Sequence, residues 1–322
     1  MNYTVPANIK LEASHCPLGC MGGDELVLKG RDRLHDLPGE FSVVRCRSCG
    51  LMRTDPRPSL DTMSYYYPEY YGPYHSTRVA EGLKQNSPGS FWKHIARKTF
   101  QFNTGRLPIR TPGRMLEIGC ASGVFLHYMA ERGWDVAGIE LSQRASEYAR
   151  ALGYSVHAGP LETAPNPNTL YDLVVGWMVF EHLHDPILAL KKLFNWTKPD
   201  ARLVISVPNA GSLEFKLLKN AWYALHLPNH LFHYTPKTLR AVLMRGGWVP
   251  EKIHHQRVLS NLFASIGYVL SDMGLRTFSI NWLMNFPRNA RKLHYVLYPL
   301  SSVLGALGQT GRMTVWARKL ND

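Results

Sequence analysis

The stretch from Arg114 to Glu140 constrains the fold more than any other part of this chain of 322 residues. Residues 115–118 form a short apolar run, which is typical of a buried strand, and a glycine-rich turn follows. A helical pattern comes next, and then a second strand, residues 135–139, which ends at Glu140. In such a unit, an acid about 20 residues past the first glycine is placed to bind ribose hydroxyls. The segment therefore predicts a doubly wound α/β sheet that binds an adenosine-type cofactor.

The residues around the turn distinguish between two kinds of cofactor. A dinucleotide fingerprint needs small residues at its first, third and sixth positions, but counting from Gly119 the sixth position is Val124. Glu117, inside the first strand, would repel a pyrophosphate but suits a ligand with an ammonium group. S-adenosylmethionine has an ammonium group, a carboxylate for the helix N-terminus and a ribose diol for Glu140. We therefore predict S-adenosylmethionine as the cofactor; the alternative is a tight turn that binds no ligand.

Cysteine spacing predicts a second, smaller unit near the N-terminus. Two close pairs are present: Cys16 and Cys20, then Cys46 and Cys49. Four thiolates in paired turns can surround Zn²⁺ tetrahedrally, and His15 is an alternative fourth ligand. The competing account is a pair of disulfides. Because no hydrophobic stretch follows Met1, we expect a cytoplasmic chain whose thiols stay reduced, and so a structural zinc ribbon.

A tyrosine-rich stretch, residues 65–71, follows the ribbon. Its rings can pack an interface between domains, or they can stack on a sugar or another planar substrate. The candidate substrate contacts here are Tyr67, Tyr70 and Tyr71. Residues 91–102 have the pattern of a basic amphipathic helix. The predicted organisation is a zinc ribbon in residues 1–58, an aromatic-rich helical connector in residues 59–112 and a Rossmann-like domain in residues 113–322.

Further strands are expected beyond Glu140. They are predicted at residues 154–157, 171–177, 202–207, 247–257 and 312–318. Residues 198–201, Lys-Pro-Asp-Ala, are predicted as a turn. The fold class is therefore α/β, with a doubly wound, mostly parallel seven-stranded sheet into which the last strand inserts antiparallel.

Four motifs in this order carry a resemblance to a known family. They are Glu117-x-Gly119-x-x-x-Gly123, Val-Phe-Glu-His-Leu-His-Asp-Pro at 179–186, Leu-Val-Ile-Ser-Val-Pro-Asn at 203–209 and Leu-Pro-Asn-His-Leu-Phe-His-Tyr-Thr at 227–235. Together they resemble the class I S-adenosylmethionine-dependent methyltransferases, in particular those of sugar and polysaccharide biosynthesis. Some of these carry an N-terminal zinc module with paired cysteines. The sugar C-methyltransferases continue into a further C-terminal domain for which this chain has no room, so we expect a hydroxyl acceptor.

The resemblance implies roles for individual residues. The cofactor contacts would be Glu117, Gly119, Cys120, Gly123, Glu140, Leu141, Leu161, Glu162 and Trp177. The catalytic candidates are His182, His230 and His233, and Asn209 is a further substrate contact. An alcohol acceptor needs a general base, and the pKa of histidine suits that role.

The predicted function is methyl transfer from S-adenosylmethionine to a hydroxyl of a sugar, glycan or lipid-linked glycan. One alternative is O-methylation of a small aromatic or quinone-like molecule. Another is a zinc-ribbon nucleic-acid-binding protein, but base-amino methyltransferases favour an Asn/Asp-Pro-Pro-aromatic motif where this chain has Phe-Glu-His-Leu, at 180–183. We expect no specific nucleic acid partner. The net charge of +13 and the uncharged stretches 258–271 and 293–311 leave open peripheral association with the inner face of the membrane.

Overall fold

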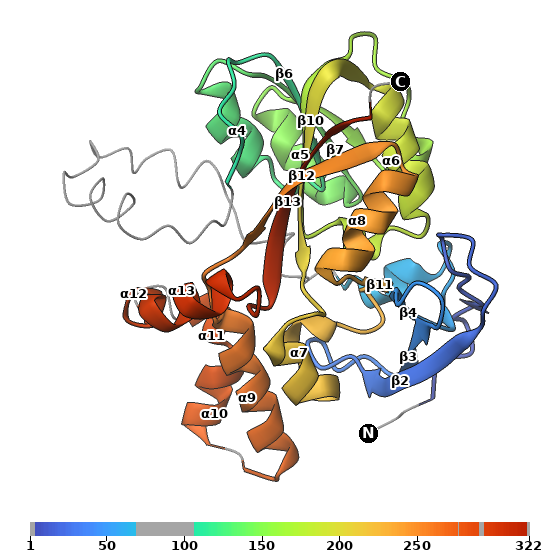
Figure 1. Cartoon of the computed structure of the whole chain (residues 1–322), viewed down its shortest axis with the longest axis vertical. Coiled ribbons are helices and arrows are strands. Elements are labelled where there is room, and N and C mark those ends of the chain that lie inside the picture. Colours follow the sequence, from blue (N-terminus) through green and yellow to red (C-terminus); the bar gives the residue numbers. More distant parts are fainter. Residues whose placement is uncertain (1–3, 69–105, 276, 290–292, 321–322) are drawn as a thin grey trace.

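The computed structural model describes residues 4–68, 106–275, 277–289 and 293–320 (Figure 1). Its main sheet has seven strands in the order β12-β13-β10-β9-β6-β7-β8. These strands are β6 (Arg114–Ile118), β7 (Asp135–Glu140), β8 (Ser155–Ala158), β9 (Tyr171–Trp177), β10 (Thr197–Pro208), β12 (Trp248–His255) and β13 (Arg312–Lys319). β13 runs antiparallel to both of its neighbours, and the pairs from β10 to β8 are parallel. The predicted doubly wound, mostly parallel sheet is therefore confirmed.

Helices cover both faces of this sheet. In Figure 1, α4 (Val124–Ala130) and α5 (Gln143–Ala151) lie on one side, and α6 (Pro186–Asn195) and α8 (Pro236–Arg245) lie on the other. The central strand β9 is consequently buried along most of its length, which explains its nearly continuous apolar sequence. Side-chain caps begin the helices: Ser142 accepts a hydrogen bond from the Ala145 amide, and Asp185 accepts one from the Leu188 amide.

Residues 198–201, predicted as a turn, instead belong to β10. The register between β10 and β9 shifts between Thr197 and Arg202. The intervening residues therefore bulge away from the partner strand without interrupting β10, and that prediction was wrong because the bulge absorbs Pro199 without ending the strand.

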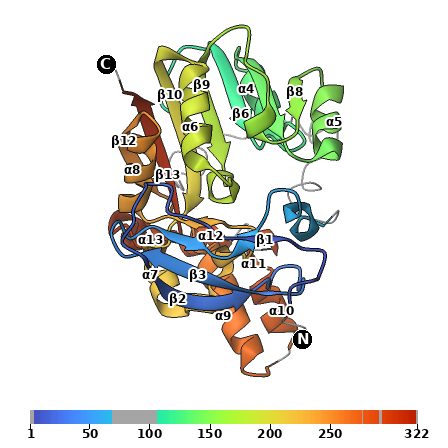
Figure 2. The ribbon, with the colours of Figure 1, turned by 90° about the vertical axis from the view of Figure 1, so that its right-hand side faces the viewer.

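The N-terminal part forms a separate four-stranded sheet in the order β11-β4-β3-β2 (Figure 1), and its strands β2 and β3 lie below the main sheet in Figure 2. Its strands are β2 (Asp24–Arg31), β3 (Glu40–Cys46), β4 (Met52–Thr54) and β11 (Phe232–His233). A two-stranded sheet pairs β1 (Leu11–Glu12) with β5 (Arg57–Pro58). Because β11 follows β10 in the chain, the α/β part contributes an edge strand to the ribbon.

The N-terminal ribbon and the α/β part also share an apolar core. Phe41 and Val43 of the ribbon pack in one cluster with Phe215, Trp222 and Leu225, which come from the segment after β10. The described residues also form short 3-10 helices: η1 (Met63–Tyr66), η2 (Leu161–Thr163), η3 (Phe180–His182), η4 (Lys219–Ala221) and η5 (Tyr223–Leu225). The predicted boundaries after residues 58 and 112 stay predictions, because residues 69–105, with the expected helix 91–102, lie outside the described residues.

A group of helices extends from the lower end of the sheet in Figure 1. It comprises α7 (Leu213–Leu218), α9 (Ser260–Asp272), α10 (Phe278–Met284), α11 (Phe286–Asn289), α12 (Leu293–Val296) and α13 (Tyr298–Ala306). Among the described residues, no helix has the length and apolar character needed to cross a membrane. Four apolar side chains at helical spacing, Val296, Leu300, Val303 and Leu307, are 72%, 52%, 58% and 66% exposed.

Candidate functional site

The turn after β6 has a backbone that only small residues permit. Gly119 and Gly123 have φ angles of +70° and +83°, and Ala121 between them also has a positive φ of 47°. A Cβ atom at Gly119 would lie 2.4 Å from Cγ2 of Val179, so the segment after β9 packs directly on this turn. The turn thus leaves its backbone close to the carboxyl ends of β6 and β9, where ligands of open α/β sheets bind.

Glu140 closes this site at the end of β7. Its Oε2 atom accepts a hydrogen bond from the Ala121 amide and its Oε1 atom accepts one from the Ser142 amide, each at 2.8 Å. Burial raises the pKa of Glu140, and these amides, with that of Leu141, act in the opposite direction. Each carboxylate oxygen has a second lone pair, so the side chain keeps the capacity to accept hydrogen bonds from a ribose diol.

Glu117 is a buried acid in β6 with a side chain only 3% exposed. Its Oε2 atom has no hydrogen-bond partner among the described residues. Burial, and secondarily the charge of Glu140, raises the pKa of Glu117 well above its ordinary value. A buried polar atom of this kind is costly unless a ligand satisfies it. The ammonium group of S-adenosylmethionine would do so, so these residues fit the predicted cofactor.

The other predicted cofactor contacts lie around the same turn. Trp177 ends β9, and its ring packs edge-to-face on Phe125 with centroids 5.3 Å apart. Cys120 is buried, and its sulfur would meet a Cβ atom at Gly138 of β7. The remaining three differ in exposure: Leu141 is 53% exposed, Leu161 is buried and Glu162 is half-buried in η2. Their contacts with a cofactor stay predictions.

The segment that packs on this turn through Val179 continues into a cluster of imidazoles. Nδ1 of His182, in η3, is 2.9 Å from the carbonyl oxygen of Asn229 and 2.8 Å from the hydroxyl of Tyr67. Nδ1 of His230 is 2.9 Å from the carbonyl oxygen of Ala224, and the rings of His182 and His230 are 4.7 Å apart. A carbonyl oxygen only accepts, so each Nδ1 carries the proton and each Nε2 carries the lone pair.

Burial keeps this cluster neutral. It lowers the pKa of His182 to about 4, despite the hydrogen bond to Asn229, and lowers the pKa of His230 well below its ordinary value. It raises the pKa of Glu181, the residue before His182, to about 8. At neutral pH the imidazoles are therefore uncharged and each Nε2 carries a lone pair, but the same burial makes them weaker bases than the ordinary histidine expected from the sequence.

Two further residues that the sequence predicted for the site, His233 and Asn209, contact other parts of the chain. His233 lies in β11, where Nε2 is 3.3 Å from the Thr54 hydroxyl, and burial lowers its pKa to about 3. Asn209 uses its whole amide: Nδ2 donates to the carbonyls of Gly308 and Thr310, and Oδ1 accepts from the Gly211 amide. The structure thus brings together Tyr67, His182 and His230, with His233 beside His230 through the shared contact to Thr54, but it does not bring Asn209 into this cluster. Tyr70 and Tyr71 lie outside the described residues.

Sequence reasoning missed two members of the cluster. Glu181 is fully buried, with Oε1 3.9 Å from Nε2 of His230. The ring of His226 is 4.9 Å from that of His230, and His226 has a positive φ of 41°. A strained residue of this kind often marks a functional site. The available signals were the position of Glu181 directly before His182 and the four-residue spacing of His226 and His230.

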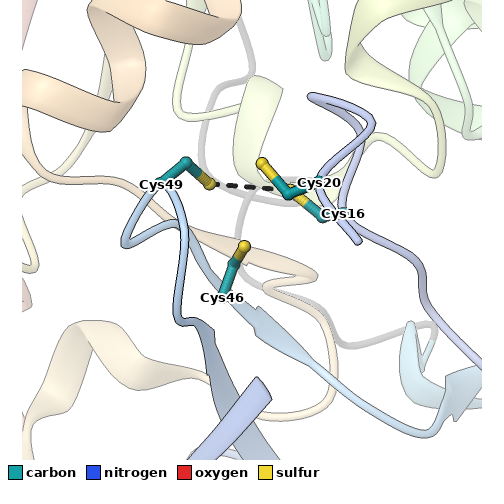
Figure 3. Close-up of side chains that lie close together, drawn as sticks. All are labelled: Cys16, Cys20, Cys46 and Cys49. Atoms are coloured by element: carbon teal, nitrogen blue, oxygen red, sulfur yellow. Dashed lines mark hydrogen bonds between the residues drawn. The ribbon is translucent and has the colours of Figure 1, made fainter. Parts of the chain in front are cut away.

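The four N-terminal cysteines converge as predicted (Figure 3). Their sulfur atoms all lie within 4.8 Å of one another, the Sγ atoms of Cys16 and Cys49 are 3.6 Å apart, and all four thiols are free. A tetrahedral zinc site with Zn–S bonds of about 2.3 Å separates sulfurs by about 3.8 Å. Burial opposes ionisation of Cys46, but the amides of Cys49 and Ser48 outweigh it and lower its pKa to about 7. The donor set therefore fits Zn²⁺.

A basic pocket of about 500 Å³ separates the ribbon from α6 and α8. Its charged and imidazole-bearing lining residues are His15, Arg57, His184, Asp185, Lys191 and Arg245. The single acid, Asp185, is engaged as the N-cap of α6, and Arg57 pairs with Glu12 at 2.9 Å. The pocket therefore suits an anionic group.

The strand order and the glycine turn with its two acids define a Rossmann-like methyltransferase fold. Residues 91–253, half of the chain, match a family model described as a methyltransferase domain. The chain belongs to this methyltransferase domain family.

Curated relatives match a shorter region. A malonyl-[acyl-carrier protein] O-methyltransferase of Serratia marcescens is 29% identical over 130 residues, which are 39% of this chain and 50% of that protein. A ubiquinone biosynthesis O-methyltransferase of Bordetella avium is 30% identical over 151 residues, 43% of this chain and 63% of that protein. The chain spans about half the length of the curated relatives it matches.

Solved structures are similar at a lower level. An S-adenosylmethionine-dependent methyltransferase from Mesorhizobium loti has a TM-score of 0.44 and 18% identity, over 66% of this chain and 94% of that one. The plantazolicin methyltransferase BpumL in complex with SAH has a TM-score of 0.44 and 17% identity, over 80% of this chain and 94% of that one.

Proposed function

We propose that this protein transfers a methyl group from S-adenosylmethionine to a hydroxyl group of its acceptor. The observation that carries the proposal is the position of His182. This neutral imidazole follows β9, in a segment that packs through Val179 on the glycine turn at Gly119. Its Nδ1 proton is held by Asn229, so Nε2 is available as a base.

Methyl transfer is an in-line displacement, so acceptor and cofactor must be aligned and water excluded. When bound, the cofactor supplies a methyl group activated by the adjacent sulfonium. Glu140 would hold the ribose, and Glu117 would hold the ammonium group. Nε2 of His182 would take the proton of the acceptor hydroxyl, while Asn229 and Tyr67 keep the ring in place.

For the acceptor we propose a hydroxyl of a sugar, glycan or lipid-linked glycan. The basic pocket beside the Glu-His segment supports an acceptor that carries a phosphate, as a nucleotide- or lipid-linked sugar does. Lys191 and Arg245 line this pocket, and the one acid in its lining, Asp185, is engaged as the N-cap of α6.

A second candidate acceptor is a small aromatic or quinone-like molecule. It is favoured by the names of the curated relatives, among them the ubiquinone biosynthesis O-methyltransferases. The ring of Tyr67 contacts that of His182 at the imidazole cluster, so an aromatic acceptor bound there would lie beside aromatic rings.

Two observations weigh against a nucleic-acid-binding ribbon. Basic side chains of the ribbon are paired with acids: Lys29 with Glu40, Arg31 with Asp36, Arg45 with Glu25 and Arg53 with Asp24. The Arg53–Asp24 pair is bidentate, with distances of 2.8 and 2.6 Å, and Arg53 is only 3% exposed. We therefore propose that the cysteines hold a structural zinc ion and that the ribbon serves the acceptor site.

Peripheral association with a membrane, in a cytoplasmic protein, is also kept as a proposal. It is supported by four exposed apolar side chains at the end of α12, in α13 and at its C-cap: Val296, Leu300, Val303 and Leu307.

Calorimetric titration with S-adenosylmethionine and, in parallel, NAD tests the cofactor. Micromolar binding of S-adenosylmethionine alone supports the assignment, and binding of neither overturns it. A panel of nucleotide-linked sugars, lipid-linked glycans and quinols, followed by mass spectrometry for methylated product, then tests the acceptor. Methylation restricted to the quinols would replace the sugar proposal with the second candidate.

A further inference from the structure

Glu181 is a carboxylic acid without the partners that burial normally requires. Its side chain is fully buried, and neither Oε1 nor Oε2 has a hydrogen-bond partner among the described residues. Nε2 of His230 lies 3.9 Å from Oε1, which is too long for a hydrogen bond. A buried carboxyl group left in this way is costly, so a group outside the protein chain is expected to complete its contacts.

The two neighbouring imidazoles are oriented as metal ligands usually are. His182 and His230 each direct Nδ1 to a backbone carbonyl, of Asn229 and Ala224 respectively, at 2.9 Å. In metalloproteins this second hydrogen bond sets the tautomer and leaves Nε2 to bind the metal. Both rings are therefore presented in the form that binds a cation.

The chain holds these residues together from two segments. Glu181 and His182 lie in η3, and His230 comes from the segment before β11. The amide of Leu231 donates to the carbonyl oxygen of Glu181 at 2.7 Å, and the hydroxyl of Thr54 donates to the carbonyl oxygen of His230 at 2.7 Å. The arrangement is therefore built into the fold and does not depend on side-chain packing alone.

One ligand atom from each of Glu181, His182 and His230 lies within 4.8 Å of those of the other two. Bonds of about 2.0–2.2 Å to one ion place neighbouring ligand atoms about 3–3.5 Å apart, so small side-chain movements close the set. We propose that Glu181, His182 and His230 bind one divalent transition-metal cation, separate from the ion held by the four cysteines. Two imidazoles and one carboxylate suit Zn²⁺, Mn²⁺, Fe²⁺ or Co²⁺.

The role of this ion rests on the proposed function. Three protein ligands leave the ion at least one coordination position for another molecule. His182 is half-buried whereas Glu181 and His230 are buried, so this open position faces the side of His182. An acceptor hydroxyl bound there would lose its proton more readily, with solvent water taking the proton at the exposed side of His182, because the cation stabilises the alkoxide. The ion would then replace Nε2 of His182 as the group that activates the acceptor, and that nitrogen would serve as a ligand.

Mn²⁺ is the probe that separates the two metal sites, because it prefers nitrogen and oxygen ligands to four thiolates. The full chain, with zinc retained in the ribbon, is titrated with Mn²⁺ and followed by electron paramagnetic resonance. The proposal expects one bound Mn²⁺ per chain. Glu181→Gln and His182→Ala should each weaken binding by more than about tenfold. The matched control is His184→Gln, since His184 contacts the carbonyl oxygen of Pro58 outside the cluster and should leave Mn²⁺ affinity unchanged.

Titration with S-adenosylmethionine on the same variants separates the outcomes. Retained cofactor binding with lost Mn²⁺ binding supports the metal site and shows that the variants are folded. No Mn²⁺ bound by the unmodified chain, or equal loss in His184→Gln, overturns the metal site. Mn²⁺ bound at one ion per chain, with no methyl transfer to any acceptor, would leave the metal site standing and contradict the proposed function.

Discussion

The hydroxyl of Tyr67 lies 2.8 Å from Nδ1 of His182, so the tyrosine-rich segment reaches the imidazole cluster. The same nitrogen contacts the carbonyl oxygen of Asn229 at 2.9 Å. Two parts of the chain far apart in sequence thus orient one ring. Orientation of a catalytic base by a neighbouring group is a recurring feature of active sites.

The Tyr67→Phe substitution should lower kcat by about tenfold, because the His182 ring loses one of the two contacts at Nδ1. Affinity for S-adenosylmethionine should not change. Steady-state kinetics and calorimetry measure the two effects. Tyr65→Phe is the matched control, since the Tyr65 ring packs edge-to-face on Tyr66. An unchanged kcat in Tyr67→Phe would mean that the contact only packs the segment.

The Glu140→Gln substitution should weaken binding of S-adenosylmethionine by about tenfold to a hundredfold. A carboxylate that accepts hydrogen bonds from a ligand contributes about 1.5–3 kcal/mol, and the amide lacks that charge. Calorimetric titration checks the change. Glu147→Gln, on the exposed side of α5, is the control and should bind as the unmodified chain does. Equal affinities for both variants would contradict the ribose-binding role.

The Cys49→Ser substitution should reduce bound zinc below one ion per chain and lower the Tm by more than about 5 °C, because metal binding is coupled to folding. Elemental analysis and thermal unfolding measure both. Cys120→Ser is the control, since Cys120 lies in the glycine turn after β6 and outside the cysteine cluster. Unchanged zinc content in Cys49→Ser would show that this cysteine is not a ligand.

Glu214 should make stability depend on pH. It is 3% exposed, and burial raises its pKa from 4.5 to about 7 despite hydrogen bonds from Trp222 and Gly311. Between these two pH values the folded chain holds a proton that the unfolded chain has lost. The resulting stabilisation is complete below about pH 4.5 and is lost as the pH rises through about 7.

The Glu214→Gln variant lacks this titration. The quantity to compare is the free energy of unfolding of the unmodified chain minus that of the variant. This difference should fall by roughly 3 kcal/mol as the pH rises from about 4.5 to above 7. Urea unfolding at several pH values measures the difference. Glu147→Gln, with an exposed side chain, should show no such trend. If this difference does not change with pH, Glu214 has the same pKa in the folded and the unfolded chain.

Reversing charge at the basic pocket should identify an anionic acceptor. The double substitution Lys191→Glu with Arg245→Glu places two acids in the pocket lining. KM for a phosphate-linked acceptor should rise by about tenfold or more, with little change in kcat, because the contact is remote from the reacting atoms. An uncharged acceptor should show no change. If both acceptors respond alike, the pocket does not bind the phosphate.

Continuous apolar runs made the main sheet predictable. Residues 171–177 were predicted as a strand and form β9, and the strand predicted at 312–318 forms β13 with one further residue. The cysteine cluster was also predictable, because paired spacing reflects the geometry of one tetrahedral ion. These features depend on local patterns that a single sequence displays.

Other features depend on contacts between distant segments. β11 has only two residues, Phe232 and His233, which is too short for any periodic signal, and its pairing with β4 is visible only in three dimensions. The burial of Glu181 has the same origin, because the segment that contains His230 covers it. The sequence places Glu181 beside a candidate base but does not indicate which way its side chain faces.

The Thr54 hydroxyl donates to the carbonyl oxygen of His230, and β11 completes the sheet to which Thr54 belongs. The N-terminal region is thus not an exchangeable module. A chimera that joined this region from one relative to the α/β domain of another would separate the two halves of a single sheet. To remain functional, such a graft must also carry the residues between β10 and α8. The unit that recombines in evolution or in the laboratory is therefore discontinuous in the chain.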